Sequence, residues 1–314
     1  AASEQVGGEN GTGMDHALPT DVRKALAVVA ERCQVPTGDA RMLRRHSNTV
    51  IALPSAGLII RIAGNPDAFT KVATSIQVTR WLSERGYPCV IPADPAGPFR
   101  VEGRVVSAWQ AADIDPDRAG SGGDLGMLLR RLHDQPLPPF SLPSLHDPLA
   151  GVAAAIEHHP DAMTTADRTW LLQQIRQLRH HWARLNFPHP PRLIHADAHS
   201  NNLLPLRGGG VLLGDWDHAT IGPCEWDLIQ IHYMHRRFAR HTDQEIEEFT
   251  TAYGWDIRNW DGFETLLRIR EISGLSPYIR RAPTQQTLRA EVTHRLATLR
   301  QGDDHARWNP PSTR

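Results

Sequence analysis

Residues 193–217 of the chain read LIHADAHSNNLLPLRGGGVLLGDWD. A short apolar run leads into a loop that carries Asp197, and a strand-like run follows Asn202. Three consecutive glycines mark a turn before a second strand-like run, which ends at Asp215. Two short runs joined by such a turn are typical of a β-hairpin. A hairpin of this length returns Asp215 to the level of Asn202 and Asp197, so we expect three oxygen-bearing side chains to converge.

This convergence suits phosphoryl transfer, in which a protein mainly positions the reactants and stabilises charge. A carboxylate near the incoming hydroxyl group orients it and can accept its proton. A second carboxylate and an amide oxygen suit Mg²⁺, a hard cation that prefers oxygen ligands. The pattern therefore favours Asp197, Asn202 and Asp215 as candidates for these roles.

The same residues carry a family resemblance. His195, Asp197, His199 and Asn202 match the pattern HxDxHxxN, and residues 215–217 match the acidic element that follows its hairpin. The stretch resembles the aminoglycoside phosphotransferase and choline kinase family of the protein-kinase-like superfamily. Three further elements add to the resemblance, which runs from about residue 43 to 228: Leu128–His133, Gly222-Pro223 and Trp226-Asp227-Leu228.

The resemblance implies an α+β, protein-kinase-like bilobal fold with a small β-rich N-terminal lobe and a larger helical C-terminal lobe. It implies an enzyme that uses ATP or GTP and Mg²⁺ to phosphorylate a hydroxyl group. Asp197 would be the catalytic carboxylate, and His195 would brace the loop. Asn202 and Asp215 would bind Mg²⁺, with Asp217 as a secondary acidic group near the metal.

The resemblance also implies nucleotide contacts in the N-terminal lobe. Arg61 stands where the family has the Lys that contacts the α- and β-phosphates. Ser47 and Asn48 would lie in the loop that covers the nucleotide, and residues 107–110, including Ser107 and Trp109, would form the hinge against the nucleobase. Two departures stand out. Arg replaces Lys at position 61, which still permits phosphate binding, and Ser75 stands where the family offers a Glu partner. No GxxxxGK[ST] motif is present, so the chain is not a P-loop kinase.

The element pattern agrees with two lobes. We predict helices over residues 21–35, 68–85, 125–133 (with Asp124 as N-cap), 166–185 (capped by Thr164 or Thr165) and most of 225–300. Strands are predicted near 47–50, 58–62, 90–92, 99–101 and 104–109, with a turn at 53–57 that makes the first two a hairpin. Residues 136–148 are Pro-rich and are expected to form a surface loop. The expected division is a leader at 1–13, an N-terminal lobe at 14–108, a hinge at 109–112 and a C-terminal lobe at 113–314.

The composition limits the classes of binding partner and the cellular compartment that we expect. The chain has 34 Lys and Arg residues against 35 Asp and Glu, a formal net charge of −1, which gives no reason to expect nucleic acid or an anionic membrane as partner. No apolar run approaches the ~18 residues of a membrane span. The three cysteines are far apart in sequence, which fits a reducing compartment, so we expect a cytoplasmic protein.

The sequence does not determine which hydroxyl compound accepts the phosphate. The resemblance permits an antibiotic such as an aminoglycoside (hence a role in antibiotic resistance), an amino sugar, a choline-like alcohol or a nucleoside. We expect the acceptor to lie against the C-terminal lobe, with His199 and Glu271 as candidate contacts. Glu271 belongs to a charged patch on an otherwise apolar helix, 263–272, and such a charge needs a partner. That partner is either a cationic acceptor, helped by the acidic run 243–248, or a nearby arginine of the chain itself.

Two alternatives to a kinase stay open at this point. The first is a metal-dependent hydrolase that uses His195, Asp197 and His199, which alternate along the chain; this reading leaves Asn202 and Asp215 unexplained. The second is a catalytically weak nucleotide-binding module, suggested by the missing Lys and Glu. Metal analysis would test the first alternative, and a transfer assay alongside nucleotide binding would test the second.

Overall fold

The computed structural model describes residues 18–45 and 47–310 of the 314-residue chain. The expected leader, residues 1–13, lies outside the described residues. The chain divides into two compact units. One holds the described part of residues 1–69 together with Pro92–Ala111, and the other holds Thr70–Ile91 and the described part of residues 112–314. The lobe boundaries and the hinge at 109–112 stay predictions.

The first unit is built on an antiparallel five-stranded sheet with the order β1-β2-β3-β5-β4. The predicted hairpin is confirmed, because β2 and β3 pair around a turn in which Gly57 has a left-handed φ of 64°. Pairing of β3 with β5 sets Arg61 opposite Ser107. The strands are β1 (Arg41–Arg45), β2 (Asn48–Leu53), β3 (Leu58–Ala63), β4 (Phe99–Val101) and β5 (Arg104–Gln110).

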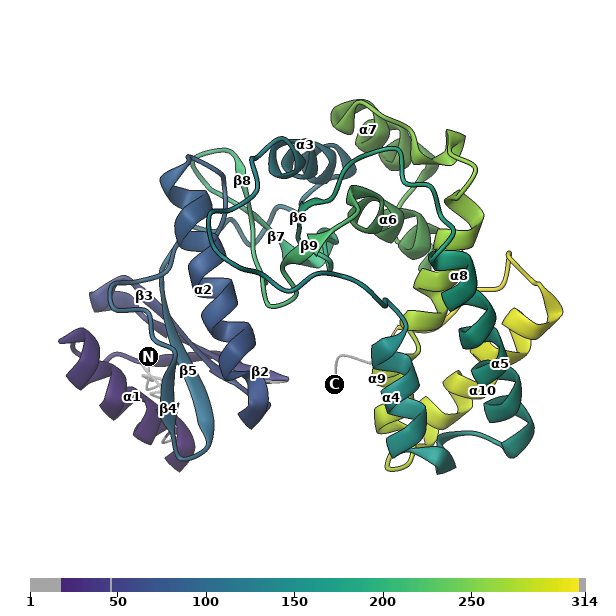
Figure 1. Cartoon of the computed structure of the whole chain (residues 1–314). Helices are drawn as coiled ribbons and strands as arrows, with labels where there is room; N and C mark the ends of the chain where they lie inside the picture. Colours follow the sequence, from purple (N-terminus) through teal and green to yellow (C-terminus); the bar gives the residue numbers. More distant parts are fainter. Residues whose placement is uncertain (1–17, 46, 311–314) are drawn as a thin grey trace, which may run out of the picture. The chain divides into compact units, whose positions relative to one another are not determined.

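Helix α1 (Thr20–Cys33) packs beside β4 and supplies one side of this unit's core (Figure 1). Its buried residues Val22, Ala25, Leu26 and Val29 follow the i, i+3, i+4, i+7 spacing of an amphipathic helix. They form one apolar cluster with sheet residues such as Ile60, which is fully buried. Burial of side chains of this size contributes about 1.5–3 kcal/mol each.

The second unit is largely helical, as predicted (Figure 1). Helix α8 packs against α4, α5 and α6, and α9 packs against α4 and α10. The helices that contribute to this unit are α2 (Phe69–Glu84), α3 (Gly122–His133), α4 (Ala150–His158), α5 (Thr165–Trp182), α6 (Cys224–Phe238), α7 (Asp243–Tyr253), α8 (Phe263–Ser273), α9 (Ser276–Arg281) and α10 (Gln286–Gln301).

Two small antiparallel strand pairs shape the stretch that opened the sequence analysis. β6 (Arg192–Ile194) pairs with β9 (Thr220–Gly222), and β7 (Leu203–Pro205) pairs with β8 (Val211–Leu213). The β7–β8 turn uses Gly209 and Gly210 at φ values of 97° and 85°, a region in which glycine carries little steric penalty. The predicted hairpin is therefore confirmed.

Three details differ from the sequence predictions. The N-cap of α3 is Ser121, and Asp124 is the N3 partner of a capping box in which each side chain accepts the other residue's backbone N–H. Residues 90–92 form no strand: Pro92 makes only an isolated bridge, and another lies just before the segment at Cys89. Helix α4 was not predicted, because its sequence AGVAAAIEH has almost no polar face to give it a helical period.

Helix α7 approaches α3 closely across two glycines. A Cβ atom at Gly122 would lie 2.3 Å from the carbonyl oxygen of Glu245, and one at Gly126 would lie 2.4 Å from that of Phe249. Any larger residue at either position would push α7 away. This contact matters for the site, because α3 carries His133 and α7 carries Tyr253, which hydrogen-bond at 2.8 Å.

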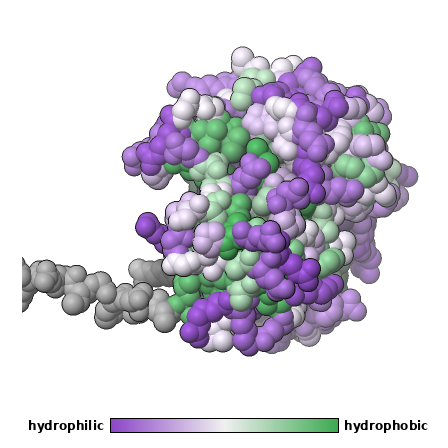
Figure 2. All heavy atoms as spheres, turned by 90° about the vertical axis from the view of Figure 1, so that its left-hand side faces the viewer, coloured by the Kyte–Doolittle hydropathy of each residue, from purple (hydrophilic) through white to green (hydrophobic). Residues whose placement is uncertain are grey.

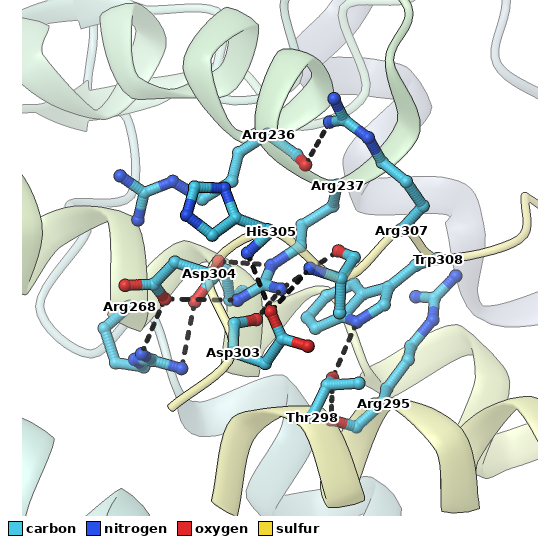
Figure 3. Close-up of polar contacts among 12 residues, drawn as sticks. Arg236, Arg237, Arg268, Arg295, Thr298, Asp303, Asp304, His305, Arg307 and Trp308 are labelled. Carbon is cyan, nitrogen blue, oxygen red and sulfur yellow. Dashed lines mark hydrogen bonds and ion pairs between the residues drawn. The ribbon is translucent and has the colours of Figure 1, made fainter. Parts of the chain in front are cut away.

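The last described segment folds back onto α6 and α10 (Figure 3). Trp308 donates its backbone N–H to the carbonyl of Arg237 at 2.7 Å and its indole N–H to Thr298 at 3.0 Å. Its ring lies 4.5 Å from the guanidinium of Arg237 and 4.9 Å from that of Arg295. Both arginines are fully buried. The tail thus closes the core at a point where two buried charges need neighbours.

The face shown in Figure 2 carries polar residues over most of its area, with small apolar patches between them. Such interspersed apolar groups are ordinary for a folded surface. Within the described residues, no helix is long and apolar enough to cross a membrane.

Candidate active site

The loop that follows β6 is held from inside by His195. Its side chain is fully buried, and its Nε2 lies 2.9 Å from the carbonyl oxygen of Gly214, just before Asp215. Its Nδ1 accepts the backbone N–H of Asp197 at 3.3 Å, so Nε2 carries the proton and donates to Gly214. The ring packs edge-on against Trp216 with centroids 4.7 Å apart. His195 therefore links the two halves of the motif and does not face solvent.

Asp227, on the first turn of α6, anchors the same loop. Its carboxylate accepts the backbone N–H of His195 at 2.9 Å and that of Ala196 at 2.7 Å. It also lies 3.0 Å from Nε2 of His133 on α3. Ala196 has a φ of 66°, a costly conformation for a residue with a side chain. Two hydrogen bonds to one buried carboxylate hold the loop in this shape, so Asp227 has a structural role.

Asp197 is the carboxylate that the loop presents to solvent, with about 30% of its side chain exposed. Burial by itself raises the pKa of this carboxyl group. The hydrogen bond and charge of His199 and the charges of Arg270 and His218 outweigh that effect and lower the pKa to about 2. Asp197 is therefore ionised throughout the physiological pH range.

Asn202 ties the loop to the second half of the motif. Its Nδ2 donates to the carbonyl oxygen of Asp197 at 2.9 Å and lies 3.3 Å from Nε2 of His199, which leaves its amide oxygen for another partner. Its own carbonyl accepts the N–H of Gly214 at 2.9 Å, directly before Asp215. Asp215 has a φ of 57° and an exposed side chain, and Asp217 is half-buried. The sequence-predicted residues Asp197, Asn202 and Asp215 are thus brought to one place.

These donors fit a hard divalent cation. An amide oxygen and one or two carboxylates are what Mg²⁺ binds when phosphate oxygens and water complete its shell. Across the described residues, no three His, Cys, Asp or Glu side chains are arranged to hold a metal ion. The hydrolase alternative needs such a group at His195, Asp197 and His199, so the geometry gives it no support. Asn202 and Asp215 offer one amide oxygen and one carboxylate, so phosphate oxygens and water would complete the shell of a cation held there.

The expected nucleotide residues lie in the first unit. Asn48 starts β2 and accepts the N–H of Gly64 through its side-chain oxygen at 3.3 Å, which ties the loop before β2 to the end of β3. Ser107 and Trp109 point to the same side of β5, where the indole N–H donates to the Ser107 hydroxyl at 3.0 Å. Both are buried. Arg61 sits opposite Ser107, and Ser47 directly precedes β2. Their roles toward a nucleotide stay predictions.

Glu271 does not point toward Asp197's loop. It is fully buried, and its Oε1 accepts from Nε of Arg237 at 2.6 Å, while its Oε2 lies 3.3 Å from Arg268. Of the two partners considered from the sequence, the geometry favours the arginine of the chain itself. Arg270, one residue earlier, is the group that reaches Asp197, with Nη2 lying 3.5 Å from Oδ1.

Sequence reasoning missed Arg270, although a signal was present. Arg270 follows Leu266 by four residues and Leu267 by three, and both leucines are buried, so the helical period turns Arg270 inward. The same argument about a charge on an inward helix applied to Arg270 as well as to Glu271.

The sequence matches the profile of the phosphotransferase enzyme family, APH, over residues 44–265, more than half of the chain. The chain belongs to this family. It is therefore an enzyme that transfers phosphate to a hydroxyl acceptor, as predicted. No curated protein matches the sequence.

Solved structures of kinases share the fold of this APH family member at low sequence identity. Amicoumacin kinase hAmiN, in complex with AMP-PNP, Ca²⁺ and Ami, has a TM-score of 0.69 and 13% identity over 93% of this chain and 98% of its own. APH(2")-IIia, in complex with GDP and kanamycin, has a TM-score of 0.62 and 14% identity over 88% of this chain and 98% of its own. A choline/ethanolamine kinase family protein from Mesorhizobium loti has a TM-score of 0.61 and 18% identity over 90% of this chain and 96% of its own. The kinase-like α+β fold is confirmed.

Proposed function

We propose that this phosphotransferase is a small-molecule kinase that transfers the γ-phosphate of ATP or GTP to a hydroxyl group, with Asp197 facing the acceptor and Asn202 and Asp215 binding Mg²⁺. One observation carries the proposal. Asn202 donates to the backbone carbonyl of Asp197 and accepts from the backbone N–H just before Asp215, so a single residue ties the backbone at Asp197 to the backbone that leads into Asp215. Such positioning is the main task of a phosphoryl-transfer site.

Asp197 orients the acceptor rather than acting as a strong base. With a pKa of about 2, its carboxylate stays ionised and accepts a hydrogen bond from the hydroxyl, which aims an oxygen lone pair at the γ-phosphorus. The new oxygen–phosphorus bond forms as the bond between the γ-phosphorus and the bridging oxygen breaks. The hydroxyl proton passes to Asp197 late in the step, when the attacking oxygen has become acidic, and then to water. Bound Mg²⁺ would neutralise charge on the phosphate oxygens.

The N-terminal residues supply the nucleotide side of the proposal. Arg61 contacts phosphate, Ser47 and Asn48 belong to the covering loop, and Ser107 and Trp109 line the nucleobase hinge. Support comes from the fold, because solved kinases that share it are complexes with AMP-PNP, GDP and ADP. Arg61 has no glutamate at position 75 to hold it, since Ser75 occupies that place and is buried. Arginine nevertheless binds phosphate through two parallel N–H groups.

The test is a transfer assay with ATP and with GTP over antibiotics, amino sugars, choline-like alcohols, sugar acids and nucleosides, with the phosphorylated product identified by mass. We expect Mg²⁺-dependent product with at least one acceptor and none from Asp197→Ala. Nucleotide binding without any transfer, across all acceptor classes, would instead identify the catalytically weak binding module.

A further inference from the structure

Arg270 lies at the acceptor end of the proposed site, where its guanidinium is held on three sides. Its Nη2 lies 3.5 Å from Oδ1 of Asp197, and its Nε donates to the side-chain oxygen of Gln230. The group stacks over Trp226 with its central carbon 4.9 Å from the ring centroid and lies 5.9 Å from the ring of Tyr233. The position is thus built by α6 and α8 together, and the side chain is not a loose surface arginine.

The guanidinium still has donors to offer. A guanidinium carries five N–H groups, and its Nη1 has no hydrogen-bond acceptor among the described residues. About 13% of the Arg270 side chain and 30% of the Asp197 side chain are exposed, so neither side chain is closed off from solvent. Asp197 at 3.5 Å is a long and incomplete partner for a charge that is otherwise buried.

The acidic groups that the sequence offered to a cationic acceptor, Glu271 and the run 243–248, have partners within the chain. Glu271 is buried against Arg237. The acidic run on α7 is also occupied: Asp243 pairs with His235, Glu245 caps its own helix, Glu247 pairs with Arg258 and Glu248 accepts from Gln244. The aromatic faces of Trp226 and Tyr233, which would otherwise receive an ammonium group, are covered by Arg270 itself.

We propose that Arg270 recognises the acceptor, and that the acceptor is an anionic alcohol whose carboxylate or phosphate group binds the open side of this guanidinium while its hydroxyl meets Asp197. The inference rests on the proposed kinase function and names the substrate class of that site. Arginine suits this task because its planar fork matches the two oxygens of a carboxylate or phosphate.

The experiment compares acceptors that share a carbon skeleton and differ in charge. One series is glycerate, glycerol 3-phosphate, glycerol and 3-amino-1,2-propanediol, and another is gluconate, glucose 6-phosphate, glucose and glucosamine. Transfer is measured with Mg²⁺-ATP and Mg²⁺-GTP, and binding of each compound is measured by calorimetry with AMP-PNP and Mg²⁺. We expect the carboxylate or phosphate members to bind and react in preference to the neutral and amino members, and the two anionic arms show which oxyanion is used.

Substitution of Arg270 separates recognition from support of Asp197. Arg270→Gln should raise the KM or Kd for an anionic compound by about 10- to 100-fold and leave that of its neutral counterpart unchanged. Arg270→Lys keeps the positive charge but loses the two parallel N–H groups of the guanidinium. Its KM or Kd for the anionic compound should lie between those of the unmodified enzyme and Arg270→Gln. Arg268→Gln is the matched control, because Arg268 lies on the same helix and pairs with Glu271 and Asp304 instead.

The outcomes distinguish this inference from the kinase function. Preference for neutral or amino acceptors, or an equal loss in Arg270→Gln for charged and neutral acceptors alike, would overturn the anionic acceptor and leave the kinase standing. Arg270-dependent binding of anions without transfer would uphold the anion site and overturn the kinase. If Arg270→Gln fails to fold, the charge series on the unmodified enzyme and on Arg270→Lys still decides between these results.

Discussion

The carboxylate of Asp227 lies 2.9 Å from the backbone nitrogen of His195, which fixes the start of the loop that carries Asp197 to the first turn of helix α6. The same carboxylate holds the next residue, Ala196, in a left-handed conformation. Asp227 is about 1% exposed, so these hydrogen bonds are made in a dry interior. The Asp-Leu pair of the Trp226-Asp227-Leu228 element thus has separate tasks: Asp227 shapes the loop and Leu228 fills the core.

Asp227→Ala is expected to destabilise the fold. It leaves two buried N–H donors and the ring of His133 without their acceptor, which should lower the free energy of unfolding by about 3–5 kcal/mol. Urea denaturation measures this loss. Asp134→Ala is the control, because Asp134 is exposed and pairs only with Arg130 one turn earlier, a pair that contributes at most about 1 kcal/mol. Equal losses in the two variants would contradict the anchoring role.

Asp197→Ala should abolish transfer while nucleotide binding survives. In the proposed site Asp197 faces the acceptor hydroxyl and not the triphosphate, so its loss removes orientation of the attacking oxygen. We expect kcat to fall by about 10³-fold or more, equivalent to roughly 4 kcal/mol of transition-state stabilisation. Steady-state kinetics gives kcat, and fluorescent-nucleotide titration gives the nucleotide Kd. Near-normal turnover would remove Asp197 from the mechanism.

Asn202→Ala and Asp215→Ala should shift the Mg²⁺ dependence together. In the proposed site both variants lose an oxygen ligand of a metal that also binds the triphosphate, so the Mg²⁺ concentration for half-maximal activity and the nucleotide KM should rise in parallel. Asp113→Ala offers a control carboxylate, since Asp113 is exposed and pairs with Arg207 on the β7–β8 turn. Mg²⁺ titrations of both variants that overlay the unmodified enzyme would place the metal elsewhere.

The fold could be predicted largely because its deciding signals are local. Short apolar runs joined by glycine-containing turns identify the β7–β8 hairpin and the β2–β3 hairpin, and periodic apolar residues identify α1, α2, α5 and α8. Helix α4 lacks such a period and was missed. The sequence favours Asp124 as the cap because residues 120–123 are rich in glycine, yet glycine is tolerated in a first turn whose N–H groups Ser121 helps to satisfy.

In the candidate site, too, the residues of one local motif could be predicted, and the contacts between distant segments could not. Asp197, Asn202 and Asp215 stand within one motif, so their convergence follows from a short hairpin. The partner of Glu271 could not be predicted from the sequence, because Arg237 lies 34 residues away on another helix and the pairing depends on how α6 and α8 pack. Sequence periodicity shows that Arg270 and Glu271 both need partners, and only the tertiary arrangement decides which of them meets Asp197.

His232 should make the fold sensitive to mild acid. Burial against Phe249 and Phe263 lowers the pKa of His232 to about 4, with Arg258 as a smaller cause, and its Nε2 has no hydrogen-bond partner among the described residues. The unfolded chain takes up this proton near pH 6.5, whereas the folded chain does so only near pH 4. Stability is therefore lost as pH falls through that window, by about 3 kcal/mol in total.

The measurement is the difference in unfolding free energy between the unmodified protein and His232→Leu at several pH values from 7 to 4. The variant should lose less stability over this range, because it has no imidazole to protonate in the unfolded state. His180→Leu, at an exposed position on α5, should leave the pH dependence unchanged. Parallel curves for the unmodified protein and His232→Leu would show that His232 is not held neutral.

Glu271→Gln distinguishes a structural glutamate from an acceptor contact. Glu271 and Arg237 are both fully buried, and Nε of Arg237 lies 2.6 Å from Oε1 of Glu271. Arg237 otherwise reaches only backbone carbonyls of the tail, the ring of Trp308, and Asp304 at 3.6 Å (Figure 3). Neutralising Glu271 leaves the arginine charge buried with little compensation, so we expect the free energy of unfolding to fall by about 3 kcal/mol or more.

Glu264→Gln is the matched control on the same helix. Glu264 also pairs with an arginine of α6, Arg236 at 2.9 Å, but its side chain is 67% exposed, so this ion pair contributes at most about 1 kcal/mol. If Glu271 is structural, Glu271→Gln should cost clearly more stability than Glu264→Gln and leave the acceptor KM unchanged at a temperature where both variants are folded. A raised acceptor KM with unaltered stability would return Glu271 to the acceptor site, because a buried ion pair cannot lose its carboxylate without a cost to folding, whereas a substrate contact can.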